Sequence, residues 1–464
     1  MAKKERNTNS VNTRKGRFFG IALPLLSSLF LLSSCAEKID ELKSKIIGED
    51  SSPLSSSSAK GLSSAAHQSH EEEGSLSYES EECDPISFHF IDRDEQWSGD
   101  AIYVKAGDND ILIDAGARGK SAAAIASYME DSSRADHLSD GNLEYVIATH
   151  AHRDHITGFA GTSQVKGIFY RYTIDNLIDF SYAGGDKNTV INNADPENQK
   201  NDSRFISFEA TYDKTTSSKT TTSYYSSDLY RDYVEARNYI VDRGTVWYTV
   251  GELCNEKQLT YTIPLGKNLS MTLVYTYFYD HTANEVKGLE SNYTSSGFSD
   301  ENDYSICLYF TQGSRHFLFT GDAETYAEHS LVKYNSLPKM DLFKAGHHGS
   351  YTASSDELLD VVDPKLCVVT CCAGNQEYAR GEENKHHTFP AQEFIDRIAK
   401  HTSWVYVTTL GEFSDTSKHY PFNGHVVVSY NEISDEQITC SNSFIPLKDS
   451  EWMKENRTMP EPWK

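Results

Sequence analysis

The chain has 464 residues, of which 38% are hydrophobic and 12% aromatic, and its formal net charge is −25 at pH 7. At about 150 residues per domain, this length could hold three domains. A surface this acidic repels polyanions, and no run of lysine or arginine follows the N-terminal region. Nucleic acid is therefore disfavoured as a partner, unless a local basic groove overcomes the repulsion.

The N-terminal region has the pattern of a bacterial export signal. Six lysines and arginines between residues 3 and 17 precede an apolar stretch from Phe18 to Leu32, which is too short for a comfortable transmembrane span. Leu32-Ser33-Ser34-Cys35 follows and resembles the lipoprotein processing box. We expect residues 1–34 to be a signal peptide, and Cys35 to be lipidated and to anchor the chain outside the cytoplasmic membrane. The alternative is a retained single-span anchor, which leaves the domain on the same side.

A tether and then a folded domain are expected after Cys35. Residues 35–84 are rich in Ser and Glu and too poor in apolar residues to fold alone. Without residues 1–34, which carry six basic residues and Glu5, the net charge becomes −30. The domain is expected over 85–464. Its first strands are predicted at 86–91, 101–104 and 111–113, followed by a helix over 121–129.

The densest group of metal-ligating residues follows the next predicted strand, 145–149. It is the string His150-Ala151-His152-Arg153-Asp154-His155. Side chains at i and i+2 of an extended segment point the same way, so His150 and His152 can converge on one ion. Asp154 and His155 can reach a second ion nearby. Imidazole and carboxylate donors suit zinc and similar transition metals.

Two later segments offer the remaining ligands. The apolar strand pattern 316–320 ends in Gly321-Asp322, and the pattern 341–345 ends in Gly346-His347-His348-Gly349. We expect Asp322 to bridge the two ions, and one of the two histidines to complete the second ion. Cys307, Cys367, Cys371 and Cys372 lie in or beside strand patterns, so burial is expected for them and disulfides are not indicated.

Residues 166–300 fit the surrounding pattern poorly. The segment is polar and rich in Tyr and Asn, with a helical stretch near 229–241 and strand-like stretches at 259–263 and 271–275. We interpret it as an insertion that covers the metal site and selects the substrate.

These motifs, in this order, resemble the metallo-β-lactamase superfamily. The likeness covers about residues 85–165 and 300–412, and it includes Asp110 to Gly116, Gly99-Asp100-Ala101-Ile102 and Asn302-Asp303-Tyr304-Ser305. The nearest branch contains the hydrolase domain of competence-type DNA-uptake proteins and the surface phosphorylcholine esterases. The resemblance implies an α/β fold, an αββα four-layer sandwich with a dinuclear site at one edge, to which the Tyr-rich insertion is added.

The resemblance also implies roles for single residues. Asp114 would orient the metal loop by hydrogen bonding. Gly346-His347 resembles the end of the superfamily's last strand, so His347 is the preferred ligand and His348 would face the substrate. Many members have a further histidine on the first ion. The only histidine in that interval is His281, whose surroundings indicate a surface turn. His150, His152, Asp322 and a bridging hydroxide would still give that ion four ligands.

The predicted function is metal-dependent hydrolysis. Two divalent ions roughly 3.5–4 Å apart, expected to be zinc, hold a bridging hydroxide and neutralise charge on the attacked group. Asp154 or a nearby imidazole would handle the proton, and His348, His386 or His387 would protonate the leaving group. The last two could instead belong to a solvated loop. A small-molecule or surface-polymer phosphoester is the expected substrate. The alternatives are a lactone or β-lactam hydrolase and a non-catalytic binding lipoprotein. No pattern indicates an oligomeric state.

Overall fold

The computed structural model describes residues 82–118, 120–183, 190–191, 228–281, 285, 301–374, 388–412, 415–431 and 436–464. All of them belong to one compact unit, Gly74–Lys464. The expected signal peptide and almost all of the expected tether lie outside the described residues, as do His386 and His387. Within the described part of the chain, no helix is long and apolar enough to cross a membrane.

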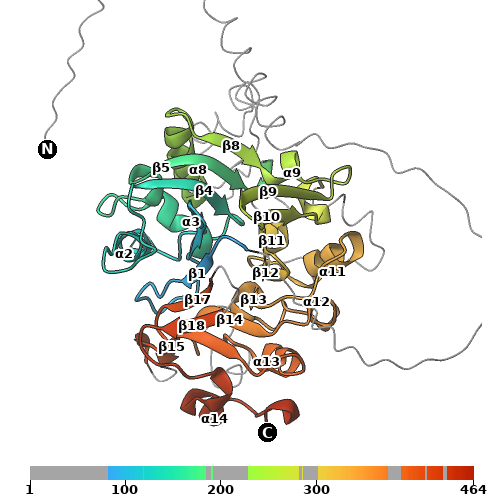
Figure 1. Ribbon diagram of the computed structural model, residues 1–464. Coiled ribbons are helices and arrows are strands. Elements are labelled where there is room, and N and C mark those ends of the chain that lie inside the picture. Colours follow the sequence, from blue (N-terminus) through green and yellow to red (C-terminus); the bar gives the residue numbers. More distant parts are fainter. Residues whose placement is uncertain are drawn as a thin grey trace, which may run out of the picture. The chain divides into compact units, whose positions relative to one another are not determined.

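Two eight-stranded sheets make up the centre of this unit, counted over the described residues (Figure 1). The first sheet has the order β18 (Glu436–Cys440), β17 (Val426–Tyr430), β1 (Ile86–Phe90), β2 (Ile102–Ala106), β3 (Asn109–Ile113), β4 (Asn142–Ala148), β5 (Thr173–Asp179) and β8 (Val246–Thr249). The second has the order β16 (Asp415–Pro421), β15 (Val405–Glu412), β14 (Leu366–Ala373), β13 (Leu342–Lys344), β12 (Arg315–Phe319), β11 (Cys307–Gln312), β10 (Leu269–Val274) and β9 (Thr260–Gly266).

The described helices and a small two-stranded sheet complete the unit. The small sheet pairs β6 (Tyr182–Ala183) with β7 (Val190–Ile191). The α-helices are α2 (Ser121–Met129), α3 (Arg153–Ala160), α8 (Asp228–Val241), α9 (Val250–Leu253), α11 (Thr325–Tyr334), α12 (Asp356–Val362), α13 (Gln392–Ile398) and α14 (Glu451–Asn456). The predicted helix over 121–129 and the predicted first strand are confirmed.

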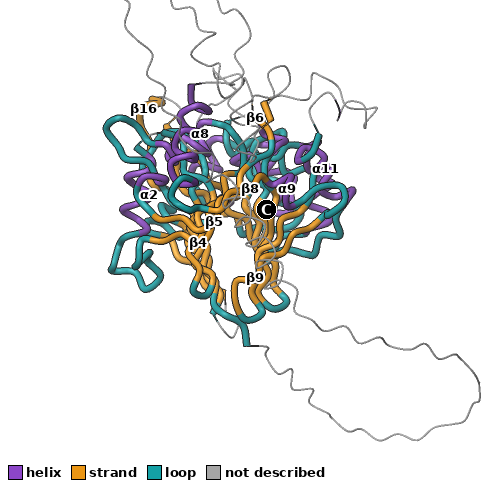
Figure 2. Tube along the Cα trace, turned by 90° about the horizontal axis from the view of Figure 1, so that it is seen from above, coloured by secondary structure: helices purple, strands orange, loops and turns teal. Residues whose placement is uncertain are grey.

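Alternating side chains on the strands build three hydrophobic layers. On β3, Ile111 and Ile113 face the core between the two sheets, whereas Leu112 packs on the side of α2, α3 and α8. Across the central core, the rings of Phe88 on β1 and Phe317 on β12 have centroids 4.9 Å apart. The outer face of the second sheet packs against α11, α12 and α13. Figure 2 shows strands inside and helices outside, so the predicted αββα architecture is confirmed.

Much of segment 166–300 belongs to the sandwich, which differs from the expected insertion. β5 and β8 extend the first sheet, and β9 and β10 extend the second. The predicted helix near 229–241 is present as α8, whose Tyr233 and Val234 pack in the same layer as α2 and α3. Residues 184–189, 192–227, 282–284 and 286–300 lie outside the described part.

Parallel strands bring the predicted metal-binding loops to one edge of each sheet. β3, β4, β5 and β8 run parallel in the first sheet, and β12, β13, β14 and β15 run parallel in the second. The loops that follow β3 and β4 therefore leave the first sheet on the same side, and those that follow β12 and β13 leave the second sheet together. These loops hold Asp114, His150, Asp322 and His348.

Helix α3 approaches the loop after β3 very closely at Gly158. A Cβ atom there would lie 1.9 Å from the carbonyl oxygen of Ala115, and the Ala115 N–H donates to the carbonyl oxygen of His155 at 2.8 Å. Only glycine permits this contact. It fixes the helix that carries Asp154 and His155. The four cysteines expected to be buried are buried.

Candidate metal centre

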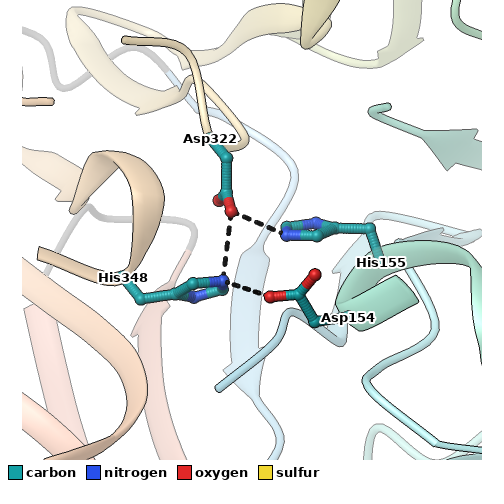
Figure 3. A group of neighbouring side chains, drawn as sticks. All are labelled: Asp154, His155, Asp322 and His348. Atoms are coloured by element: carbon teal, nitrogen blue, oxygen red, sulfur yellow. Dashed lines mark hydrogen bonds and ion pairs between the residues drawn. The ribbon is translucent and has the colours of Figure 1, made fainter. Parts of the chain in front are cut away.

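Four predicted site residues meet at the edge where the two sheets face each other (Figure 3). Asp154 and His155 come from the first turn of α3, Asp322 from the loop after β12, and His348 from the short 3-10 helix η4 (Gly346–Gly349). Each offers one ligand atom, and these atoms lie within 4.8 Å of one another. All four side chains are buried.

The carboxylate of Asp322 is the meeting point of this group. Its Oδ2 lies 2.9 Å from His155 Nε2 and 3.1 Å from His348 Nε2. His348 Nε2 is also 3.2 Å from Asp154 Oδ2. Lys344 Nζ, at the end of β13, lies 3.3 Å from the other oxygen of Asp322. The two sheets are thus joined through one buried acidic side chain.

The second nitrogen of each central imidazole is tied to an acceptor outside the group. His155 Nδ1 donates to Asp114 Oδ2 at 2.7 Å, and His348 Nδ1 donates to the carbonyl oxygen of Thr370 at 2.9 Å. With the proton on Nδ1, the lone pair of a neutral ring lies on Nε2, the nitrogen that faces Asp322. Metal-ligating histidines are oriented in this way.

Asp114 also holds the backbone at the start of the histidine string. Its Oδ1 accepts the N–H of Thr149 at 2.8 Å, and its Oδ2 accepts the hydroxyl of Thr149 at 2.7 Å. The residue has φ 58, the left-handed region that L residues rarely adopt. These contacts fix both the ring of His155 and the chain at Thr149.

His150 presents an unpartnered nitrogen. The hydroxyl of Thr149 donates to Asp114, so its oxygen is left to accept from His150 Nδ1, 3.1 Å away. His150 is fully buried, and within the described part of the chain its Nε2 has no hydrogen-bond partner. Burial, with the neighbouring rings of His155 and His152, holds the pKa of His150 well below its usual range, so the ring is neutral.

The sequence favoured His347 over His348 as a metal ligand, and the structure favours His348. His348 lies in the four-residue group, whereas His347 Nε2 is 3.9 Å from Asp322 Oδ2 and His347 Nδ1 contacts Glu324 Oε1 at 3.1 Å. Both have left-handed backbone, φ 43 and φ 53. This kink turns successive side chains in different directions, which strand periodicity could not show.

Lys344 and Asp100 also contact the group, and Glu324 contacts the adjacent His347; the sequence indicated no role for these three residues. Lys344 Nζ lies 2.6 Å from Asp100 Oδ2, and the hydroxyl of Thr370 donates to the other oxygen of Asp100. Lys344 is the one charged residue in the run Leu342-Phe343-Lys344-Ala345, and a buried cation in an apolar strand is the signal that could have found it.

The charge state of the group favours the binding of a cation. Burial disfavours the ionised form of Asp322, but His155, His348 and Lys344 outweigh burial and hold the pKa of Asp322 well below its usual range. The pKa values of Asp100 and Asp154 are lowered too, also against burial. Of these three buried carboxylates, Asp100 and Asp322 contact Lys344, and further positive charge must come from protonated histidines or from bound ions.

The donor set fits divalent metal ions. It combines buried imidazole nitrogens, oriented from outside, with buried carboxylates, and His150 Nε2 has no other use among the described residues. The residues Asp154, His155, Asp322 and His348 can hold one ion, and His150 and His152 lie beside them: the ring centroids of His150 and His155 are 4.1 Å apart.

Comparison with known proteins agrees with this geometry. Residues 95–168 match the model of the Metallo-beta-lactamase superfamily. Over these residues the chain is similar to that superfamily. The matched segment includes Asp114 and the whole histidine string.

Curated relatives match over short segments. ComE operon protein 3 of Bacillus subtilis is 25% identical over 121 residues, which cover 25% of this chain and 14% of that protein. Recombination protein 2 of Haemophilus influenzae is 34% identical over 105 residues, which cover 23% of this chain and 12% of that protein. The match thus spans a small part of either relative. Among solved structures, the short form of human tRNase Z is 10% identical with a TM-score of 0.31, covering 70% of this chain and 93% of that one.

The charges on the histidines predict how the stability of the metal-free protein, kept in excess chelator, depends on pH. Burial opposes protonation of His155 and His348, but Asp322 and other carboxylates dominate and raise both pKa values well above the usual 6.5. A raised folded-state pKa stabilises the protein below the unfolded-state value, and this stabilisation is lost as pH rises through the folded-state value.

We therefore expect the melting temperature of the protein in excess chelator to fall as pH rises above about 6.5. Asp322→Asn, which removes the main charge partner, should flatten this fall. An equally steep fall in Asp322→Asn would show that the pH dependence arises elsewhere.

Proposed function

We propose that this protein is an exported, dinuclear metal-dependent hydrolase of phosphoesters. The observation that carries the proposal is the convergence of buried Nε2 atoms on Asp322, while their Nδ1 atoms are bonded to acceptors behind them. Ordinary structural histidines have no reason to share this arrangement around one carboxylate.

The residues divide between two ions. His150, His152 and Asp322 would hold the first, and Asp154, His155, Asp322 and His348 the second. When bound, divalent ions such as zinc supply an activated water and neutralise the charge that develops on a phosphoryl oxygen. Asp322 would be the shared ligand, because its Oδ2 contacts His155 and His348 of the second set and its charge acts on His150 of the first.

His347 is suited to protonate the leaving alkoxide. Although burial disfavours the charged ring, Asp322 and Glu324 together raise the pKa of His347, which favours the protonated ring. Glu324 Oε1 accepts from Nδ1 at 3.1 Å, which leaves Nε2–H on the side of Asp322. We assign to His347 the donor role and to His348 the ligand role, and so reverse the roles that the sequence favoured.

Substrate class is inferred from chemistry and from the relatives. The name of recombination protein 2 concerns nucleic acid, whose backbone is a phosphodiester, but the net charge of −25 disfavours polyanionic substrates. A small or surface-bound phosphodiester meets both conditions. Hydrolysis of a lactone or β-lactam needs the same activated water and is the alternative.

Turnover of model substrates tests the class. Protein supplied with zinc or manganese should hydrolyse bis-p-nitrophenyl phosphate, measured by release of nitrophenolate, at least about tenfold faster than nitrocefin or a simple lactone, and a chelator should abolish the rate. Faster turnover of nitrocefin or the lactone would support the alternative. Bound metal without turnover of any of the three would indicate a binding lipoprotein.

A pair of adjacent variants tests the two histidine roles. His347→Gln should lower kcat on the phosphodiester by about 10²–10⁴ while metal content stays at the wild-type value. His348→Gln should reduce the number of bound ions, measured by elemental analysis. The reverse outcome, an ion lost from His347→Gln and both ions kept in His348→Gln, would restore the sequence-based assignment.

Export and lipid attachment are part of the proposal, and they rest on the basic and apolar N-terminal pattern that ends at Cys35. In a bacterial host, the full chain should partition with membranes and gain lipid mass on its N-terminal peptide, and Cys35→Ser should lose that mass. An unmodified Cys35 in protein recovered from membranes would favour the retained single-span anchor.

A further inference from the structure

We propose that Glu301 is a protein ligand of the ion held by His150 and His152. This inference rests on the proposed dinuclear site and supplies the ligand that the sequence did not find. The histidine of that interval, His281, is engaged elsewhere, since its Nδ1 contacts Asp280 Oδ1 at 2.8 Å and the carbonyl oxygen of Tyr277 at 3.2 Å.

Glu301 lies directly against the first metal-binding pair. Its Oε2 is 2.9 Å from His152 Nε2, and the two side chains are only 13% and 24% exposed. Donors that share one ion at about 2.1 Å in tetrahedral geometry lie roughly 3.4 Å apart. The glutamate oxygen and the histidine nitrogen are therefore already near the spacing of two ligands on one ion.

The unpartnered nitrogen of His150 makes this more than a surface ion pair. His150 and His152 have ring centroids 4.8 Å apart, and His150 Nε2 is buried with no hydrogen-bond partner among the described residues. An ion pair between His152 and Glu301 would leave that buried nitrogen unsatisfied, which is unfavourable. An ion bound by all three side chains would satisfy it.

Glu301 is held by a well-anchored turn. It begins the 3-10 helix η3 (Glu301–Tyr304), which immediately precedes β11. The next residue, Asn302, donates to Glu324 Oε1 at 3.1 Å. Asp303 Oδ1 accepts the N–H groups of Glu324 and Ala327 at 3.1 and 3.2 Å, so η3 is fixed to the start of α11. A ligand on such a turn is pre-positioned.

The assignment gives the first ion a carboxylate in addition to the shared one. His150, His152, Asp322 and Glu301 supply four protein donors, two nitrogen and two oxygen. Carboxylate donors suit manganese and iron as well as zinc, so the first ion should discriminate less among these metals than an all-histidine site would.

Metal content of the full chain tests the inference independently of activity. After equilibration with zinc and removal of loosely bound ions, we expect two ions per wild-type chain and one per Glu301→Gln chain, or at least tenfold weaker binding of one ion in a titration. His152→Asn should release the same ion, and the double variant should lose no more than either single variant.

The matched control is Glu357→Gln. Glu357 also pairs with a histidine, His329, at 3.0 Å, but the pair is exposed and lies outside the metal group. This variant should keep two ions. In excess chelator, the wild-type protein and Glu301→Gln should melt at similar temperatures. This result would show that the substitution leaves the fold unchanged.

The outcomes separate two failures. Two ions bound with wild-type affinity in Glu301→Gln would overturn the role of Glu301 and leave the dinuclear site standing. A wild-type chain that binds no ion would overturn the proposed function itself, and with it this inference.

Discussion

The buried carboxylate of Asp322 is the interaction on which the site depends. It lies between an imidazole from the first sheet's helix α3 and an imidazole from the second sheet's η4, and a buried lysine contacts its other oxygen. Such a carboxylate is costly to bury unless positive charge surrounds it. Protons on the histidines can supply that charge, and so can divalent ions that displace those protons.

The sandwich brings the imidazoles and carboxylates of this site together at one edge. Parallel strands in both sheets release their following loops at common edges, and the buried core between the sheets fixes those edges relative to each other. Asp114, Thr149, Thr370 and Glu324 then orient the rings from behind. The orientation of the rings thus depends on contacts from outside the central group, a common arrangement in metal sites.

Local motifs made the architecture and the central group predictable. The string from His150 to His155, Asp322 and the paired histidines each follow a short apolar strand, and their order indicates one sheet edge. The unpredicted parts depend on contacts distant in sequence. Lys344 pairs with Asp100 across 244 positions, which no local pattern reveals. The left-handed backbone at His347 and His348 decides which ring faces inward.

There is a physical reason why residues 166–300 have the composition of an insertion although much of the segment belongs to the sandwich. β9 lies at the edge of its sheet, and its side chains alternate between exposed and buried, so half of its residues are polar or solvated. β8 is the corresponding edge of the first sheet. Polar edge strands separated by long connections have the composition of an insertion, although the strands complete the sheets.

An anomalous difference map from crystals grown with zinc would test the central claim most directly. The account predicts two peaks on either side of Asp322, one beside His150 and His152 and one beside Asp154, His155 and His348. A map without peaks there, with His155 and His348 still bonded directly to Asp322, would show that the group is a protonated structural cluster and not a metal centre.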